Sequence, residues 1–241
     1  MPEKAERKAL MAGLTKLNED MATLAELSEL AIRKAVDSLA RIDEGAAEEV
    51  FTLDQEIYAL QQEIEGTCVD LIALHAPVAR DLRTITTSLK ITTDLDRIGR
   101  YAKDIAEVTV EFQGDTERHF KKLVSIPHMA DLTVQMVDTA IRAFVNRDAE
   151  SVRNIAAVDD SVDALNDEIF REIVTYMMDG SMKVVVGARY ILVGRYLERI
   201  ADHAVNIGER VVYMVTGERP PRVRAADRAA AHRPGPDSGS P

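Results

Sequence analysis

One apolar pattern occurs twice in this chain, and it restricts the possible folds more than any other feature. Within Val193–Met214 the apolar residues alternate at spacings of four and three, which is the pattern of a helix buried along one face. The same pattern occurs 102 residues earlier, starting at Ile91 where the later copy starts at Val193. The chain is therefore an internal duplication, and we expect the same arrangement of helices in each half.

Turn signals divide each half into three helices. In the first half we predict helices over about 14–43, 50–74 and 77–112. Pro77 should lie in the first turn of the third helix. Backbone N–H groups in that turn have no hydrogen-bond partner within the helix, so proline, which lacks the N–H, loses nothing there. The second half repeats this pattern, with its first helix starting at about Pro127.

The predicted fold class is all-α. Short connections between long helices force antiparallel neighbours, so each half should form an elongated three-helix bundle. The architecture is then two tandem three-helix bundles, made of six long antiparallel helices. We place the first bundle at 1–114 and the second at 115–217, and we expect a disordered tail at 218–241.

Composition excludes several classes of function. The net charge of −11 argues against a nucleic-acid partner, which would require a basic face. Cys68 is the only cysteine, so we predict no disulfide within the chain and no thiolate metal cluster, and we expect a buried thiol. The sequence shows no signal peptide and no apolar run of the ~20 residues that span a membrane. We expect a cytoplasmic protein, and peripheral attachment through partners stays open.

A row of side chains with oxygen atoms runs beside the apolar pattern of the later copy. Glu198 and Asp202 lie four residues apart, so they stack on one face of the helix, and Asn206 and Glu209 continue the row. Two ionised carboxylates at this spacing repel one another unless a cation stands between them. The row therefore predicts either arginine partners or a metal ion.

The sequence leaves both kinds of cation open. Arg195 and Arg199 are placed to neutralise the row as a ladder of surface salt bridges. The preceding helix carries Asp159 and Asp163, also four residues apart, and two facing acidic rows would form a carboxylate cage. Such oxygen ligands suit iron, manganese or magnesium. His203 points about 100° away from the row, so we expect it in the core or at the surface rather than as a ligand.

Sequence patterns typical of enzymes are missing. There is no Glu-x-x-His pair of the ferritin-like type, no phosphate-binding glycine loop and no Gly-x-Ser-x-Gly. We therefore assign no catalytic residue and expect a protein that is not an enzyme. Two alternatives stay open, a metal-dependent hydrolase and a metal-free helical scaffold.

Three segments resemble the PhoU family of phosphate-specific transport accessory proteins, namely Pro77–Arg83, Asp94–Gly99 and Tyr196–Ile207. In that family an acidic motif, Glu or Asp followed four residues later by Asp, lies on the third helix of each bundle and carries multinuclear metal clusters. The resemblance therefore implies a metal cofactor, in the first place iron, with manganese, magnesium or zinc as alternatives.

The resemblance also implies a regulatory function. PhoU-like proteins restrain the phosphate-starvation response and link the Pst phosphate transporter, through its ATPase PstB, to the sensor kinase PhoR. We accordingly expect a negative regulator of phosphate uptake that acts as a metal-binding adaptor between these partners, and we expect a homodimer.

The first half departs from the acidic motif. Asp96 is followed four residues later by Arg100, where the motif has an acid, and we predict an ordinary salt bridge between the two. On the facing helix Tyr58 stands where the second half has Asp163. The acidic residues that the first half retains could form only a weaker site, and they are Asp54, Asp96, Asp104 and Glu107. We expect the second bundle to hold metal and the first to hold it weakly or not at all.

Overall fold

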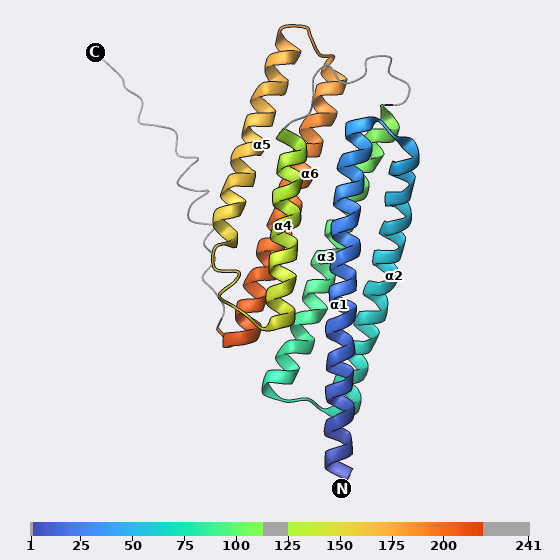
Figure 1. Cartoon of the computed structure of the whole chain (residues 1–241), viewed down its shortest axis with the longest axis vertical. Coiled ribbons are helices and arrows are strands. Elements are labelled where there is room, and N and C mark those ends of the chain that lie inside the picture. The colour runs from blue at the N-terminus through green and yellow to red at the C-terminus, as the bar shows by residue number, and fades with distance from the viewer. Residues whose placement is uncertain (1, 113–124, 219–241) are drawn as a thin grey trace, which may run out of the picture.

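The computed structural model describes residues 2–112 and 125–218. Within these ranges the chain forms six α-helices and no strand (Figure 1). The helices are α1 (Pro2–Arg41), α2 (Glu44–His75), α3 (Ala79–Glu111), α4 (Ser125–Asn146), α5 (Ile155–Met178) and α6 (Val184–Thr216). The predicted all-α fold with two tandem three-helix bundles is confirmed.

The two bundles lie side by side along their length (Figure 1). Helices α1, α2 and α3 pack against one another, and α4, α5 and α6 do the same. The bundles meet through two further contacts, α1 with α4 and α3 with α6. Four helices therefore form the centre of the molecule, while α2 and α5 lie on its outer sides.

The duplicated apolar pattern forms the cores. All seven of its positions on α6 are buried, from Val193 to Met214, and so are the seven from Ile91 to Phe112, the last of which is the C-cap of α3. Cys68 is buried in the first core, as predicted, and burial raises the pKa of its thiol to about 12. None of the helices in the described ranges is both long and apolar enough to cross a membrane.

Some predicted boundaries are wrong. Helix α1 begins at Pro2 instead of about residue 14, and Leu10 continues its buried face one turn further towards the N-terminus. Pro77 lies before α3 and not in its first turn. Ala76 ends α2 in a left-handed conformation (φ 41°), and Pro77 follows such a cap because proline cannot continue the helix. The predicted boundary at 114 and most of the predicted tail lie outside the described residues.

Candidate metal centre

Two close contacts fix the register between α5 and α6. A Cβ atom on Gly194 would lie 2.7 Å from Asn166 Oδ1, and one on Gly208 would lie 3.3 Å from Ile155 Cγ2. Between these points the helices run antiparallel, so residues 198–202 of α6 lie opposite residues 159–163 of α5. The two acidic rows of the second bundle therefore lie at the same level on neighbouring helices.

Glu198 is at the centre of this region. Its side chain is buried, and Oε2 accepts a 2.8 Å hydrogen bond from Asn166 Nδ2 on α5. Arg195 Nη1, from the preceding turn of α6, also donates to Oε2. The predicted pairing with Arg195 is thus confirmed. Arg199 does not continue the ladder, because it turns to the first bundle and donates to the hydroxyl of Tyr101 on α3 at 3.3 Å.

The other predicted ligands of the second bundle differ in exposure. Asp159 is buried, and Asp163, Asp202 and Glu209 are partly buried, whereas Asn206 is exposed to solvent. Within residues 2–112 and 125–218, no three Asp, Glu, His or Cys side chains come together in a way that could hold a metal ion. The donors have the right chemistry and lie on neighbouring helices, but in this structure three or more of them are not gathered around one point. The metal site stays a prediction.

The first bundle already contains cations among its acidic residues. Arg100 Nε lies 3.0 Å from Asp96 Oδ2, which confirms the predicted salt bridge. Lys103 Nζ lies 3.7 Å from Asp54 Oδ2 and 3.9 Å from Glu107 Oε1. The ammonium group of Lys103 therefore lies near the place that a metal ion bound by Asp54 and Glu107 would occupy. Its positive charge would repel the metal ion. The sequence analysis missed Lys103, although its counterpart in the second bundle, Val205, is apolar.

Asp104 of the first bundle still lies among negative charges, and its pKa is raised. Burial is the main cause that raises the pKa of Asp104, and the negative charge of Glu107 raises it further. Lys103 and Arg199 act in the opposite direction. On the facing helix Tyr58 is half exposed and lies away from the core. The two bundles therefore differ in the charge at equivalent places, as the asymmetry of the motif indicated.

A buried polar network joins the two bundles, and the sequence analysis did not predict it. Asp94 on α3 accepts hydrogen bonds from two residues of α6: Oδ1 lies 2.9 Å from His203 Nδ1, and Oδ2 lies 2.8 Å from Arg210 Nε. Asp94 and His203 are both buried. His203 is thus in the core, as expected, but its partner is an acid of the other half. The signal in the sequence was Asp94 itself, a carboxylate within an otherwise buried helical face.

Aromatic contacts extend this network along α3 and α6. The ring of His203 stacks on Tyr101, with 5.9 Å between centroids, and Tyr101 stacks on Tyr196 at 6.1 Å. The guanidinium of Arg199 lies 5.5 Å from the centre of the Tyr101 ring, within the range of a cation–π contact. The contact between α3 and α6 therefore combines charge and aromatic stacking.

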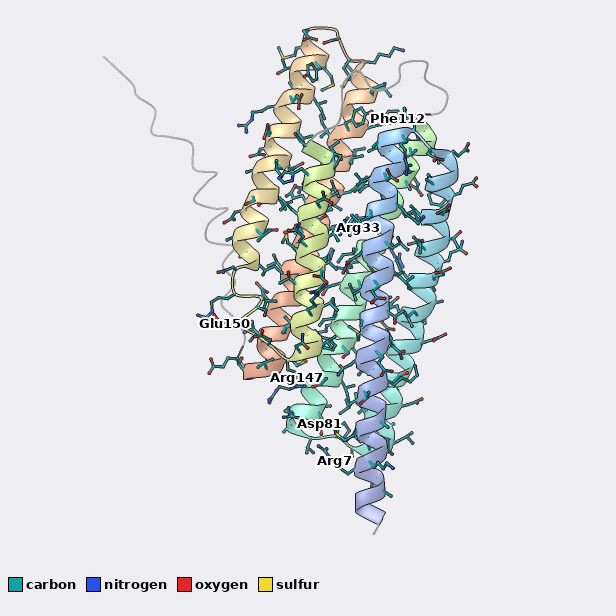
Figure 2. The ribbon with its side chains drawn as sticks, in the orientation of Figure 1. Arg7, Arg33, Asp81, Phe112, Arg147 and Glu150 are labelled. Atoms are coloured by element: carbon teal, nitrogen blue, oxygen red, sulfur yellow. The ribbon has the colours of Figure 1, made fainter. Side chains whose placement is uncertain are left out.

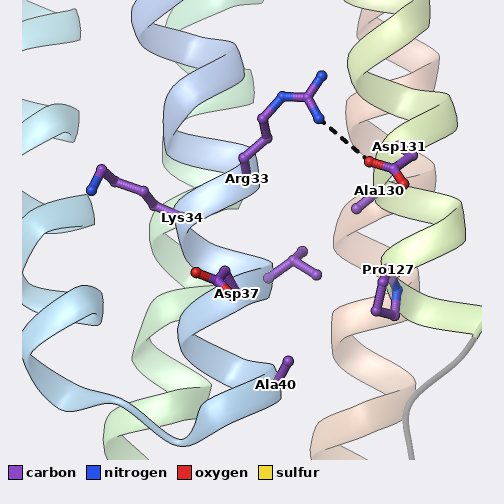
Figure 3. Close-up of a pocket in the computed structure, with 8 residues that line it drawn as sticks. Arg33, Lys34, Asp37, Ala40, Pro127, Ala130 and Asp131 are labelled. Carbon is purple, nitrogen blue, oxygen red and sulfur yellow. Dashed lines mark hydrogen bonds and ion pairs between the residues drawn. The ribbon is translucent and has the colours of Figure 1, made fainter.

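A shallow pocket of about 340 Å³ lies between α1 and α4 (Figure 3). Its charged groups already have partners: Arg33 Nη1 lies 3.4 Å from Asp131 Oδ1, Lys34 pairs with Glu49, and Asp37 pairs with Arg41. The pocket therefore offers little free charge for a ligand.

Comparison with known proteins decides the family. The PhoU domain family matches residues 21–109 and again residues 126–211. The chain belongs to the PhoU family. The two matched ranges coincide with the two bundles, so each bundle is one PhoU domain.

Relatives in the PhoU family extend over most of the chain. A protein of Clostridium acetobutylicum named phosphate-specific transport system accessory protein PhoU homolog is 33% identical over 214 residues, which are 88% of this chain and 97% of the relative. The relative of the same name from Deinococcus radiodurans is 38% identical over 71% of this chain and 79% of its own length. The crystal structure of PhoU from Pseudomonas aeruginosa superposes with a TM-score of 0.80 at 33% identity, covering 86% of this chain and 99% of that one.

Proposed function

We propose that this protein regulates phosphate uptake as an accessory protein of a phosphate-specific transport system. The observation that carries the proposal is the match of both bundles to the PhoU domain, together with relatives of that name along most of the chain. These names describe an accessory protein and not an enzyme. Six long helices with extended side surfaces suit a role in binding other proteins.

The finer proposal is a negative regulator that connects two partners, a PstB-like transporter ATPase and a PhoR-like sensor kinase. It is supported by two apolar hairpin ends at opposite ends of the molecule (Figure 1). The turn between α2 and α3 exposes Leu74 and Val78, and the turn between α5 and α6 exposes Met178, Val184 and Val185. Large apolar side chains that are exposed together commonly mark protein interfaces. Two such ends suit an adaptor with two partners.

Deletion of the gene tests the regulatory proposal. A reporter of phosphate-uptake expression should rise in phosphate-replete cells that lack the gene, and the intact gene should restore the low level. A variant with Val184→Ser and Val185→Ser should fail to restore it if this apolar end binds a partner, while exposed Arg153→Gln should restore it fully. An unchanged reporter on deletion, with loss of a phosphatase activity instead, would favour the hydrolase alternative.

Metal binding is a separate part of the proposal. Glu198 and Asp202 would supply the main ligands in the second bundle, with iron as the first candidate. A bound metal would require Glu198 to turn from Arg195, since this arginine occupies the carboxylate in the structure. Elemental analysis of untagged protein should find metal that Glu198→Ala with Asp202→Ala removes and that Asp96→Ala leaves. Protein without stoichiometric metal would support the metal-free scaffold.

The proposal also includes a homodimer, as expected from the family resemblance. Multi-angle light scattering of the purified protein should give twice the mass of one chain. A mass of 26.7 kDa at all concentrations would refute this part alone.

A further inference from the structure

Four arginines lie at the end of the molecule where α1 and α3 begin (Figure 1). They come from three parts of the chain, and they are Arg7, Arg80, Arg83 and Arg147. Figure 2 shows Arg147, Asp81 and Arg7 near one another at this end. We propose that Arg80, Arg83 and Arg147 form a binding site for inorganic phosphate, which goes beyond the proposed regulatory function.

Two of the three arginines of the site are held in place by specific contacts. Arg147 follows α4, and its Nη1 donates a 2.7 Å hydrogen bond to Oγ1 of Thr84, which is buried on α3. Arg80 lies one turn before Thr84 on the same helix, and Arg83 is its direct neighbour. Arg83 is itself anchored, because its Nε donates to the carbonyl oxygen of Met214 on α6 at 3.4 Å. Arg147 and Arg83 are thus each held by a hydrogen bond, and Arg80 and Arg83 lie close enough for their charges to act on Arg147.

Positive charge at this site exceeds the negative charge around it. The charge of Asp81 acts favourably on Arg147, but Asp81 already pairs with Arg7, whose Nη1 lies 2.6 Å from Asp81 Oδ2. Asp148, the next residue after Arg147, accepts from Ser151 and from the backbone N–H of Glu150. Burial lowers the pKa of Arg147, and the charges of Arg80 and Arg83 lower it further. The protein as a whole has a net charge of −11, so this local group of arginines stands out as a place that would attract an anion.

The backbone of Arg147 has the left-handed conformation that commonly ends a helix. Its φ is 56°, in the left-handed region that favours glycine, at the position that ends α4. The hydrogen bond from Asp148 N to Ala143 O, 2.9 Å long, closes this cap. The equivalent turn of the first half has Ile42 at φ 51°, so the positive φ belongs to the duplicated turn, and the residue type is what differs between the halves.

Comparison of the two repeats shows that the combination of Arg147 and Thr84 occurs once and is not repeated at the equivalent positions. Helices α1 and α4 match at an offset of 105, so the counterpart of Arg147 is Ile42, which also has a positive φ of 51°. Helices α3 and α6 match at an offset of 102, so the counterpart of Thr84 is the buried Val186. At the equivalent positions the other half has two apolar residues, Ile42 and Val186, in place of the hydrogen-bonded Arg147 and Thr84.

Phosphate fits the chemistry of this site. Guanidinium groups bind phosphate oxygens through two parallel, charge-assisted hydrogen bonds, and a multiply charged anion would offset the repulsion among three of them. Arg83 and Arg147 are partly buried, so a small anion reaches both more readily than an acidic protein surface does. The site lies at the end of the molecule, apart from the acidic rows of both bundles, so binding there does not involve the predicted metal ligands.

Isothermal titration calorimetry with the full-length protein tests the proposal directly. Inorganic phosphate is titrated at physiological salt, and sulfate is titrated in parallel. Two variants, Arg147→Ile and Thr84→Val, introduce the residues of the other repeat. Thr84→Ser keeps the hydroxyl that positions Arg147. Arg142→Gln removes an exposed arginine of α4 that pairs with Asp138, and it serves as the matched control.

We expect wild-type protein to bind phosphate with a Kd below about 1 mM. Arg147→Ile should weaken binding by about tenfold or more, the loss that one charge-assisted hydrogen bond gives. Thr84→Val should weaken it several-fold, Thr84→Ser should restore it, and Arg142→Gln should leave it unchanged. Circular dichroism of each variant should confirm that the helices are intact.

Three results would overturn the proposal. They are no phosphate binding by the wild type, equal binding by wild type and Arg147→Ile, and equal affinity for sulfate, which would show a general anion patch. Equal binding by the two Thr84 variants would overturn the positioning role of this residue. The measurement uses no partner protein, so it can fail while the regulatory function stands, and the reverse also holds.

Discussion

Asp94→Ala should weaken the contact between the two bundles more than any change to an exposed salt bridge. Asp94 has an exposed fraction of only 3%, and it accepts hydrogen bonds from both His203 and Arg210 of the other bundle. Alanine removes the only charge that these two groups share. Their hydrogen-bond donors would then lie at the interface between α3 and α6 without this acceptor.

The expected magnitude follows from the exposure of the partners. Removal of one member of a buried ion pair costs about 3–5 kcal/mol when the other stays buried. The side chain of Arg210 is 31% exposed, so its guanidinium can reach water, and we expect a loss of about 2–3 kcal/mol in the free energy of unfolding. For a chain of this size, the Tm should fall by roughly 4–12 °C.

The assay is urea unfolding followed by circular dichroism, with Asp138→Ala as the control. Asp138 pairs with Arg142 one turn later on α4, and the two side chains are 38% and 75% exposed. Such a pair contributes only about 0.3–0.5 kcal/mol. A loss for Asp94→Ala no greater than that for Asp138→Ala would refute the idea that the buried network stabilises the pairing of the bundles.

Three further predictions concern single residues. Burial and the charge of Asp138 raise the pKa of Glu29 from 4.5 to about 7, so the folded protein binds a proton that the unfolded chain has lost, and stability falls as the pH rises from 4.5 through 7. Glu29→Gln should therefore stabilise by on the order of 1–2 kcal/mol at pH 8 in urea unfolding, but not at pH 5. Leu197→Asp places a charge in a fully buried position and should unfold the second bundle, seen as lost helical circular dichroism and rapid proteolysis. Cys68, with a thiol pKa of about 12, should react with a disulfide reagent only as urea unfolds the protein.

The helices and their cores were predictable because they depend on local periodicity. The spacing of apolar residues on α3 and α6 predicted which side chains are buried, and the duplication doubled the signal. The connection at Pro77 was placed less well, since proline is common both at the start of a helix and just after the end of one. Helix α1 was underestimated because Leu10 and Leu14 continue its apolar face through a stretch rich in charged residues.

The candidate site was predictable only in part. Spacing along one helix gave the salt bridges of Asp96 with Arg100 and of Glu198 with Arg195. It could not give Lys103 with Asp54, or Asp94 with His203, because these contacts join different helices and depend on how the helices are turned. Periodicity predicts which face of a helix is buried, but not which helix covers it.

The duplication helps to predict which helices meet. Helices α3 and α6 are equivalent helices of the two repeats, so each residue pair between them has an equivalent pair with the roles of the helices exchanged. At the offset of 102, Asp94 corresponds to Tyr196 and Tyr101 corresponds to His203. The hydrogen bond of Asp94 with His203 and the stacking of Tyr101 on Tyr196 are therefore equivalent pairs about a pseudo-two-fold axis.

The two pairs have diverged in a way that favours unlike repeats. Two copies of the first repeat in this arrangement would place each Asp94 opposite Tyr101, so the buried carboxylate would lose both His203 and Arg210. Two copies of the second repeat would place Tyr196 opposite His203, without a carboxylate. Since a buried charge without its partner costs more than a well-made pair gains, the interface selects the first repeat with the second. The interface therefore favours pairing of unlike repeats over pairing of two like repeats from different molecules.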